Sequence, residues 1–200
     1  MEKESVLVAG YEERFIWLDG EINPRVAYQF KRMLAKLNKL KTSPIIFYVR
    51  GPGGNPHSTF FMMSEIVASS GPVAVVAHGL VNSGSFTITQ AGAHRLALPG
   101  TKFTFHPAEG YFKENSKGLV RLGQDQFTES LRRLMLIDAI QLSWFFKKGR
   151  PTKVIFDLFR AETTLSLPQA RKLHIIDDYY NRKEFLRDRR IARKLIKAKL

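Results

Sequence analysis

Apolar and polar positions along the first half of the chain alternate between two periods. Apolar residues recur at helical spacing over residues 26–37, with arginine and lysine off that stripe, and again over residues 60–67. Short apolar runs bounded by turn residues predict strands at residues 45–49 and 73–77. Strands that alternate with helices of this length predict an α/β fold, with right-handed crossovers and a mainly parallel sheet.

Glycine-rich and serine-containing turns follow two of these strands. Gly51-Pro52-Gly53-Gly54 follows the first, and Ser83 follows the second and opens a segment, residues 86–93, that can be helical. Sites in parallel sheets form at the carboxyl ends of strands, so both turns are expected at one rim. Glycine lets backbone N–H groups approach a developing oxyanion, and the first turn of a helix favours negative charge on a serine oxygen.

A serine nucleophile needs a neighbouring base, and His106, at the end of a predicted strand over residues 102–105, is the candidate. Each of these residues also has an ordinary structural interpretation. The glycines can form only a turn, Ser83 can be only an N-cap, and a histidine at a strand end is usually a half-buried polar residue. Ser85 competes with Ser83 for either role. The three elements in this order favour a serine hydrolase.

Five segments carry a resemblance to a known family: RFIWLDGEI from Arg14, IFYVRGPGG from Ile46, GLVNS ending at Ser83, AGAHRLALP from Ala91, and His106. Over residues 14 to about 180 the chain resembles the proteolytic subunit of the ATP-dependent Clp protease (ClpP), a family of serine peptidases with a crotonase-like fold. The resemblance implies an α/β fold of repeated βαβ units with a protruding handle helix. It also implies that Ser83 is the nucleophile and His106 the general base, with the N–H groups of Gly54 and Gly84 forming the oxyanion hole.

The third member of the expected triad is Glu162. Aligning TLSLPQA, from Thr164, with the corresponding element of the family places Glu162 where the family has aspartate and Ala161 where it has arginine. A glutamate can still accept the imidazole N–H and fix its tautomer. Glu162 can equally be a solvated residue near a helix end, and Asp157 and Asp138 are weaker candidates.

The resemblance also implies how substrate is bound and how subunits assemble. The substrate groove would involve Gly53, Gly110 and Tyr111, with Gly110 letting a peptide backbone add as a strand. The helical pattern of residues 122–148 corresponds to the handle helix through which two heptameric rings stack. Its three consecutive aromatics, residues 144–146, exceed what one helix face of a monomer buries. An AAA+ unfoldase would supply unfolded protein, and ATP would be used only by that partner, because the chain has no Walker-type motif.

The composition of the chain indicates its number of domains, its use of metals or cofactors, and its location. The 200 residues, 44% of them hydrophobic, fit one compact domain, which we expect over residues 1–180. The chain has no cysteine, which excludes disulfides and a thiol nucleophile, and its histidines lack metal-ligand spacing, so neither a metal nor a cofactor is expected. With no secretory signal pattern and no apolar run of membrane-spanning length, a cytoplasmic location is expected.

Residues 181–200 form a basic segment with a helical pattern. They hold nine lysines and arginines against two acidic residues, a net charge of +7 out of the chain's +14. Phe185, Asp188, Ala192 and Leu195 share one side of the predicted helix, and charges lie nearly all round it. We expect a solvated helical extension. Attachment to an acidic protein, nucleic acid or anionic membrane surface is the functional alternative.

The residues favour a serine hydrolase, and the resemblance implies a serine endopeptidase that degrades unfolded proteins and peptides inside a ring of identical subunits. A catalytically inactive ring subunit is the first alternative, since Asn82 and Ala161 depart from the family's pattern. A crotonase-fold enzyme acting on an acyl thioester is the second, because the same glycine N–H pair could polarise a thioester carbonyl. The pair of Ser83 and His106 disfavours the second alternative.

Overall fold

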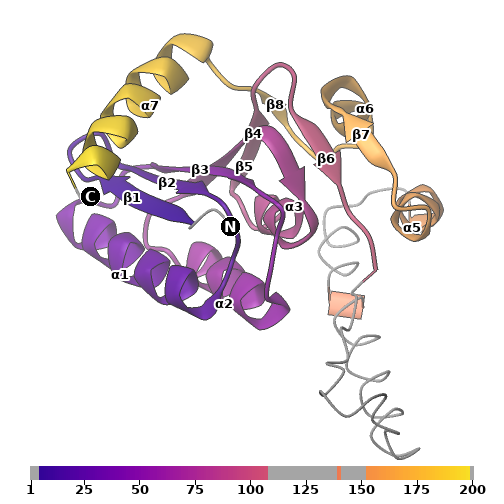
Figure 1. Ribbon diagram of the computed structural model, residues 1–200, viewed down its shortest axis with the longest axis horizontal. Helices are drawn as coiled ribbons and strands as arrows, with labels where there is room; N and C mark the ends of the chain where they lie inside the picture. The colour runs from indigo at the N-terminus through magenta and orange to yellow at the C-terminus, as the bar shows by residue number, and fades with distance from the viewer. Residues whose placement is uncertain (1–4, 108–138, 141–151, 199–200) are drawn as a thin grey trace, which may run out of the picture. The chain divides into compact units, whose positions relative to one another are not determined.

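The computed structural model describes residues 5–107, 139–140 and 152–198. Its helices and strands are labelled in Figure 1 and, in chain order, are β1 (Val6–Gly10), β2 (Phe15–Asp19), α1 (Pro24–Leu40), β3 (Ile45–Gly51), α2 (Pro56–Val67), β4 (Val73–Asn82), α3 (Ser83–Thr89), β5 (His94–Ala97), β6 (Lys102–Thr104), α5 (Thr152–Arg160), β7 (Thr164–Ser166), α6 (Leu167–Lys172), β8 (Asp178–Tyr179) and α7 (Arg182–Lys197).

Most elements that the sequence predicts in the first half of the chain are confirmed. The helices predicted at residues 26–37 and 60–67 are parts of α1 and α2, and the strands predicted at 45–49, 73–77 and 102–105 match β3, β4 and β6. The helix predicted at 86–93 is α3, which begins three residues earlier and ends at Thr89. The handle-helix prediction and the aromatic cluster at 144–146 lie outside the described residues, apart from residues 139–140.

The chain contacts divide the protein into two units. The first unit contains Met1–Phe105 and Thr163–Leu200, and the second contains His106–Glu162. The first unit holds the sheet with helices α1, α2, α3, α6 and α7, and the second holds α5. The predicted boundary at residue 180 falls within the first unit, which contains both β8 and α7.

The sheet of the first unit has eight strands and is mainly parallel, as predicted. Its strand order is β1-β2-β3-β4-β5-β8, and β6 pairs with both β4 and β7. Only the pairs β1–β2 and β6–β7 are antiparallel within the part of the chain that the structure describes. The mixed α/β architecture expected from the sequence is therefore confirmed.

Strand β4 changes its partner halfway along its length. Its first half, Ala74–Ala77, pairs with β5, whereas Leu80–Asn82 at its end pairs with β6. Between the two halves lies Gly79, whose φ of +67° is a backbone conformation that glycine adopts at low cost. The bend lets β4 extend past β5, so that the strand ends beside β6 and leads directly into Ser83.

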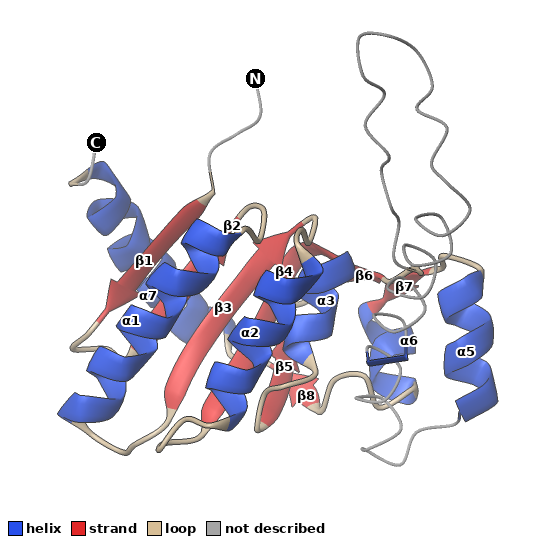
Figure 2. Cartoon of the chain, turned by 90° about the horizontal axis from the view of Figure 1, so that it is seen from below, coloured by secondary structure: helices blue, strands red, loops and turns tan. Residues whose placement is uncertain are grey.

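Helices cover both faces of this sheet. Figures 1 and 2 show α1 and α2 on one face and α7 on the other. Successive residues of β3 point to opposite faces, as strand geometry requires. The ring of Phe47 packs on Phe30 of α1, with centroids 4.7 Å apart, while the ring of Tyr48 packs on Phe185 of α7, with centroids 5.7 Å apart.

Helix α7 is packed on the sheet, which differs from the expected solvated extension. Phe185, Asp188 and Ala192 are buried, and they lie on the side that the helical spacing had placed together. The Tyr48 hydroxyl donates a hydrogen bond of 2.7 Å to Asp188 Oδ2, and Arg187 Nε donates one of 2.8 Å to Asp188 Oδ1. A buried carboxylate is tolerated when such partners replace water. Burial also raises the pKa of the Tyr48 phenol, so this hydroxyl keeps the proton that it donates.

Among the helices that the structure describes, none combines the length and the apolar character needed to cross a membrane.

The packing of α7 predicts that the C-terminal helix contributes to stability. Replacing Phe185, which lies against Trp17 and Tyr48, by alanine should lower the free energy of unfolding by about 3 kcal/mol. Leu186→Ala on the same helix is the matched control, because Leu186 is 45% exposed and its loss should cost about 0.5 kcal/mol or less. Urea denaturation followed by circular dichroism measures both values. Equal, small losses would show that α7 is not part of the core.

Candidate active site

Two turns meet at the carboxyl ends of neighbouring parallel strands. Strand β3 ends at Gly51 and continues into Pro52-Gly53-Gly54, and β4 ends at Asn82 and continues into Ser83. The two strands pair in parallel, and Gly51 lies opposite Val81. The turns therefore lie at one rim of the sheet, as the alternation of strands and helices predicts.

The turn after β3 lies directly against the start of α3. A Cβ atom placed on Gly53 would lie 2.6 Å from the Gly84 backbone nitrogen and 2.7 Å from Ser83 Cβ. The backbone of Gly53 also has a φ of +103°, which side-chain-bearing residues rarely adopt. Both constraints require glycine at this position, and they bring the glycine-rich turn into contact with the candidate nucleophile.

Gly54 is fixed by hydrogen bonds on either side of it. The Ile22 N–H donates to the Gly53 carbonyl at 2.6 Å, and the Asn55 N–H donates to the Ile22 carbonyl at 2.8 Å. The hydrogen bonds of this short parallel bridge involve the Gly53 carbonyl and the Asn55 N–H, and the Gly54 N–H takes no part in them. A Cβ on Gly54, whose φ is +138°, would clash with the Ile22 carbonyl oxygen. The N–H group of Gly54 is thus held in a defined direction.

Gly84 supplies a second backbone N–H group next to Ser83. It lies in the first turn of α3, where N–H groups have no partner inside the helix. A Cβ on Gly84 would lie 2.5 Å from Thr59 Oγ1 in the first turn of α2. Thr59, which the sequence analysis did not single out, is buried and donates to the Asn55 carbonyl at 3.0 Å. No local sequence signal distinguishes Thr59, because its role depends on the contact between two helices.

Ser83 itself has a backbone conformation that is uncommon for serine. Its φ is +49°, in the left-handed region, although it is the first residue of α3. A residue without glycine's freedom is held there at a cost on the order of 1–3 kcal/mol. The same sharp strand-to-helix turn exposes the nucleophilic serine of other hydrolases. Ser83 is half-buried, and no hydrogen bond between described residues engages its hydroxyl.

The structure separates Ser83 from its competitor Ser85. Ser85 is fully buried, and its Oγ makes no hydrogen bond to any described residue. That oxygen lies 3.3 Å from the place where a Cβ of Gly51 would be, so Ser85 points into the first unit beneath the glycine-rich turn. A substrate carbonyl cannot approach an oxygen without accessible surface, so Ser83 is the accessible serine of this turn.

His106 is the first residue of the second unit and is half-buried. Its Nδ1 lies 2.7 Å from the Pro107 carbonyl oxygen. Because a carbonyl oxygen only accepts hydrogen bonds, the neutral ring carries its proton on Nδ1, and Nε2 is the atom with a lone pair. This tautomer is the one in which Nε2 can accept a proton from a serine hydroxyl.

Glu162, the last residue of the second unit, is exposed and has a φ of +50°. Its backbone N–H donates to the Phe159 carbonyl at 3.2 Å, just after the end of α5. Asp157, a weaker candidate, forms an exposed ion pair of 2.8 Å with Lys153 on the same helix. Asp138 and the predicted substrate-binding residues Gly110 and Tyr111 lie outside the described residues.

Comparison with known proteins supports the family to which these motifs point. The protein-family model described as Clp protease matches residues 2–178. This chain superposes on the solved structure of a ClpP1 mutant from Listeria monocytogenes with a TM-score of 0.75 and 20% sequence identity. The match covers 86% of this chain and 95% of the Listeria chain. That structure shares the fold of this protein. The chain belongs to the Clp protease family.

Individual relatives are distant. An ATP-dependent Clp protease proteolytic subunit 2 from Gluconobacter oxydans is 32% identical over 104 residues, which are 50% of this chain and 47% of that protein. An ATP-dependent Clp protease proteolytic subunit from Pinus thunbergii is 26% identical over 173 residues, 84% of each chain. The match to the Gluconobacter protein thus spans about half of its length.

The close approach at Gly53 generates a prediction that does not depend on catalysis. Gly53→Ala should lower the free energy of unfolding by several kcal/mol or displace Ser83, since the new Cβ has no room beside the Gly84 nitrogen. Gly100→Ala is the matched control. Gly100 also has a positive φ, of +83°, but nothing lies within 4 Å of its Cβ position, so only the backbone cost of about 1–2 kcal/mol is expected. Denaturant unfolding compares them, and equal losses would contradict the close approach.

Proposed function

We propose that this protein is a serine endopeptidase of the ClpP type that cleaves unfolded protein chains. The observation that carries the proposal is the contact between the Gly53 backbone and the Ser83–Gly84 turn. It brings the glycine-rich turn next to a half-buried serine in a strained backbone conformation, and the Gly54 and Gly84 N–H groups belong to the two segments that meet. Such an arrangement is suited to stabilising the negative charge that forms on a carbonyl oxygen during acyl transfer.

The proposed reaction assigns one step to each group. Ser83 Oγ attacks the carbonyl carbon of the scissile peptide bond while His106 Nε2 accepts the hydroxyl proton. The N–H groups of Gly54 and Gly84 bind the resulting oxyanion. His106 then gives the proton to the departing amine nitrogen, which leaves an acyl ester on Ser83. A water molecule activated by His106 hydrolyses that ester and regenerates the serine. No cofactor on this chain is needed.

Chain connectivity supports Glu162 as the residue that orients His106. Strands β6 and β7 pair in antiparallel register with Thr104 opposite Thr164, and the two threonine hydroxyl oxygens lie 2.8 Å apart. His106 follows Thr104 by two residues, and Glu162 precedes Thr164 by two residues. The second unit therefore begins and ends at a pair of bonded strands, which favours a carboxylate of the Glu162 segment over Asp157 one helical turn earlier.

The family also supports a proposal about assembly. Relatives named as proteolytic subunits of an ATP-dependent protease suggest that an AAA+ ATPase supplies unfolded chains to this protein. We propose stacked heptameric rings that enclose the cleavage sites, because a degradative site that accepts many sequences needs to be kept away from folded proteins. The substrate would add as a strand along Gly53 and the segment around Gly110 and Tyr111.

One observation favours the alternative of an inactive ring subunit. The His106 Nδ1 proton is directed to the Pro107 carbonyl, whereas an active triad directs it to a carboxylate. Glu162 is exposed in this structure. An active triad would therefore need the His106 Nδ1 proton to be directed to Glu162 instead of the Pro107 carbonyl. Chemical labelling of Ser83 distinguishes the two functions.

Ser83→Ala should abolish labelling by a fluorophosphonate probe and hydrolysis of a fluorogenic peptide, because the attacking oxygen is removed. Ser85→Ala is the matched control and should keep labelling, since Ser85 is buried beneath the glycine-rich turn. In-gel fluorescence and peptide turnover measure both effects. Absence of labelling in the unmodified protein supports the inactive subunit, and loss of labelling only in Ser85→Ala would overturn the choice of serine.

Glu162→Gln should lower kcat by a factor on the order of 10⁴ with little change in stability, because a neutral amide can hold the imidazole in the wrong tautomer. Asp157→Asn removes one negative charge from the neighbouring helix and should leave kcat nearly unchanged, since Asp157 is paired with Lys153. Steady-state hydrolysis of a peptide substrate measures both rates. If the effects were reversed, Asp157 would be the orienting carboxylate.

A further inference from the structure

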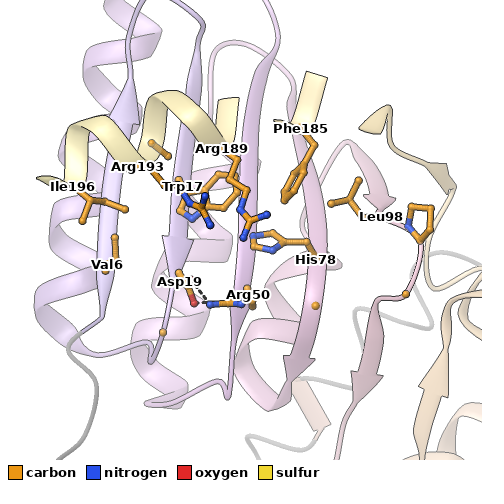
Figure 3. A pocket seen from close by; sticks show the side chains of 15 residues that line it. Val6, Trp17, Asp19, Arg50, His78, Leu98, Phe185, Arg189, Arg193 and Ile196 are labelled. Atoms are coloured by element: carbon orange, nitrogen blue, oxygen red, sulfur yellow. Dashed lines mark hydrogen bonds and ion pairs between the residues drawn. The ribbon is translucent and has the colours of Figure 1, made fainter. Parts of the chain in front are cut away.

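A cavity of about 510 Å³ lies between helix α7 and the face of the sheet that the helix covers. All of its lining residues belong to the first unit (Figure 3). Part of its wall is apolar and includes Trp17, Leu98 and Phe185, and the cationic side chains Arg50, Arg189 and Arg193 also line it. Cavities of this size hold small organic molecules.

The charges around the cavity are unbalanced. Arg50 Nε donates a hydrogen bond of 2.8 Å to Asp19, which is the cavity's only lining carboxylate among the described residues. Arg189 and Arg193 are one helical turn apart on α7, and their side chains have no recorded ion pair or hydrogen bond within the described ranges. Like charges at this spacing repel each other. An anion between the two guanidinium groups would remove the repulsion.

A buried polar atom at the cavity also lacks a partner. His78 is 7% exposed, and its Nε2 makes no hydrogen bond to any described residue. Its ring packs against the rings of Trp17 and Phe185, with centroid distances of 4.7 and 5.1 Å. Figure 3 shows Arg189 extending from α7 toward this ring. Leaving a buried polar atom unsatisfied costs on the order of 1–3 kcal/mol, but Nε2 has almost no accessible surface, so a ligand in the cavity would pack against the ring without bonding to this atom.

His78 adds no positive charge to the cavity. Burial, followed by the positive charge of Arg50, lowers the pKa of His78 to about 4, so the ring is neutral at pH 7. The guanidinium groups of Arg189 and Arg193 add donors with a planar geometry suited to phosphate and carboxylate.

We propose that this cavity binds a small organic anion, with its phosphate or carboxylate head group between Arg189 and Arg193 and its apolar body against Trp17 and Leu98. The site is separate from the turns that carry Ser83 and does not depend on peptidase activity. The low-dielectric walls strengthen the attraction between the guanidinium groups and the head group. The apolar body would account for the hydrophobic part of the lining, which inorganic ions would leave uncovered.

Isothermal titration calorimetry on the full chain, with phenyl phosphate as the probe, tests the proposal. Phenyl phosphate should bind with a saturable heat, inorganic phosphate should bind at least about tenfold more weakly, and benzyl alcohol should not bind. Benzoate distinguishes the two head groups, since tighter binding of benzoate assigns a carboxylate ligand and tighter binding of phenyl phosphate assigns a phosphate ester. No saturable heat from either anion at millimolar concentration would overturn the proposal.

Three variants decide whether the heat comes from this cavity. Arg189→Gln and Arg193→Gln should each weaken phenyl phosphate binding by about tenfold or more, the loss expected for a charge-assisted hydrogen bond. Arg190→Gln is the matched control, because it removes the same charge from an exposed position of α7 that does not line the cavity. Thermal denaturation checks that each variant is folded. If Arg189→Gln is unfolded, Arg193→Gln alone tests the site, because Arg193 is exposed and its replacement should not affect folding. Equal weakening in Arg190→Gln would show nonspecific attraction to a basic helix and would overturn the assignment.

Discussion

The close approach of two backbone turns, at Gly53 and at Ser83–Gly84, is the constraint on which the rest of the site depends. A Cβ on Gly53 would lie 2.6 Å from the Gly84 nitrogen, so only glycine lets the turn after β3 reach the start of α3. The approach also requires β3 and β4 to be adjacent and parallel, because only then do both turns lie at the same rim. The close approach of the two turns therefore requires both the observed strand order and glycine at position 53.

The strain at Ser83 is small compared with the packing that surrounds it. A left-handed serine costs on the order of 1–3 kcal/mol. The residues that follow it in α3 are buried, including Phe86 and Ile88, and burying each such side chain contributes about 1.5–3 kcal/mol. The ring of Phe86 is stacked on Phe105, with centroids 4.7 Å apart. Burial of two side chains thus offsets the strain, and the helix holds Ser83 in a conformation that it would not adopt alone.

The sequence predicts the elements whose signals are local and misses the interactions that join distant segments. The spacing of apolar residues was sufficient for α1, α2, β3 and β4, and the glycines marked the turns at the rim. The conformation of Ser83 had no local signal, since a serine before a helix is usually an N-cap. The packing of α7 was missed for a similar reason. Asp188 reads as one more solvated charge until its partner Tyr48, 140 residues earlier, is known. The burial that excludes Ser85 likewise depends on the folded core.

Neighbouring residues of strand β3 serve opposite faces of the sheet. Neighbouring side-chain positions on a strand point to opposite faces, so Arg50 lines the cavity under α7 while a Cβ on Gly51 would point toward Ser85 and the Gly20 backbone. Arg50 is also held by Asp19, and its carbonyl accepts a hydrogen bond of 3.0 Å from Gly20. A change at Arg50 would therefore disturb both faces at once. Arg189 and Arg193 belong to α7 alone, so a loss of anion binding in their variants can be separated from any effect on Ser83.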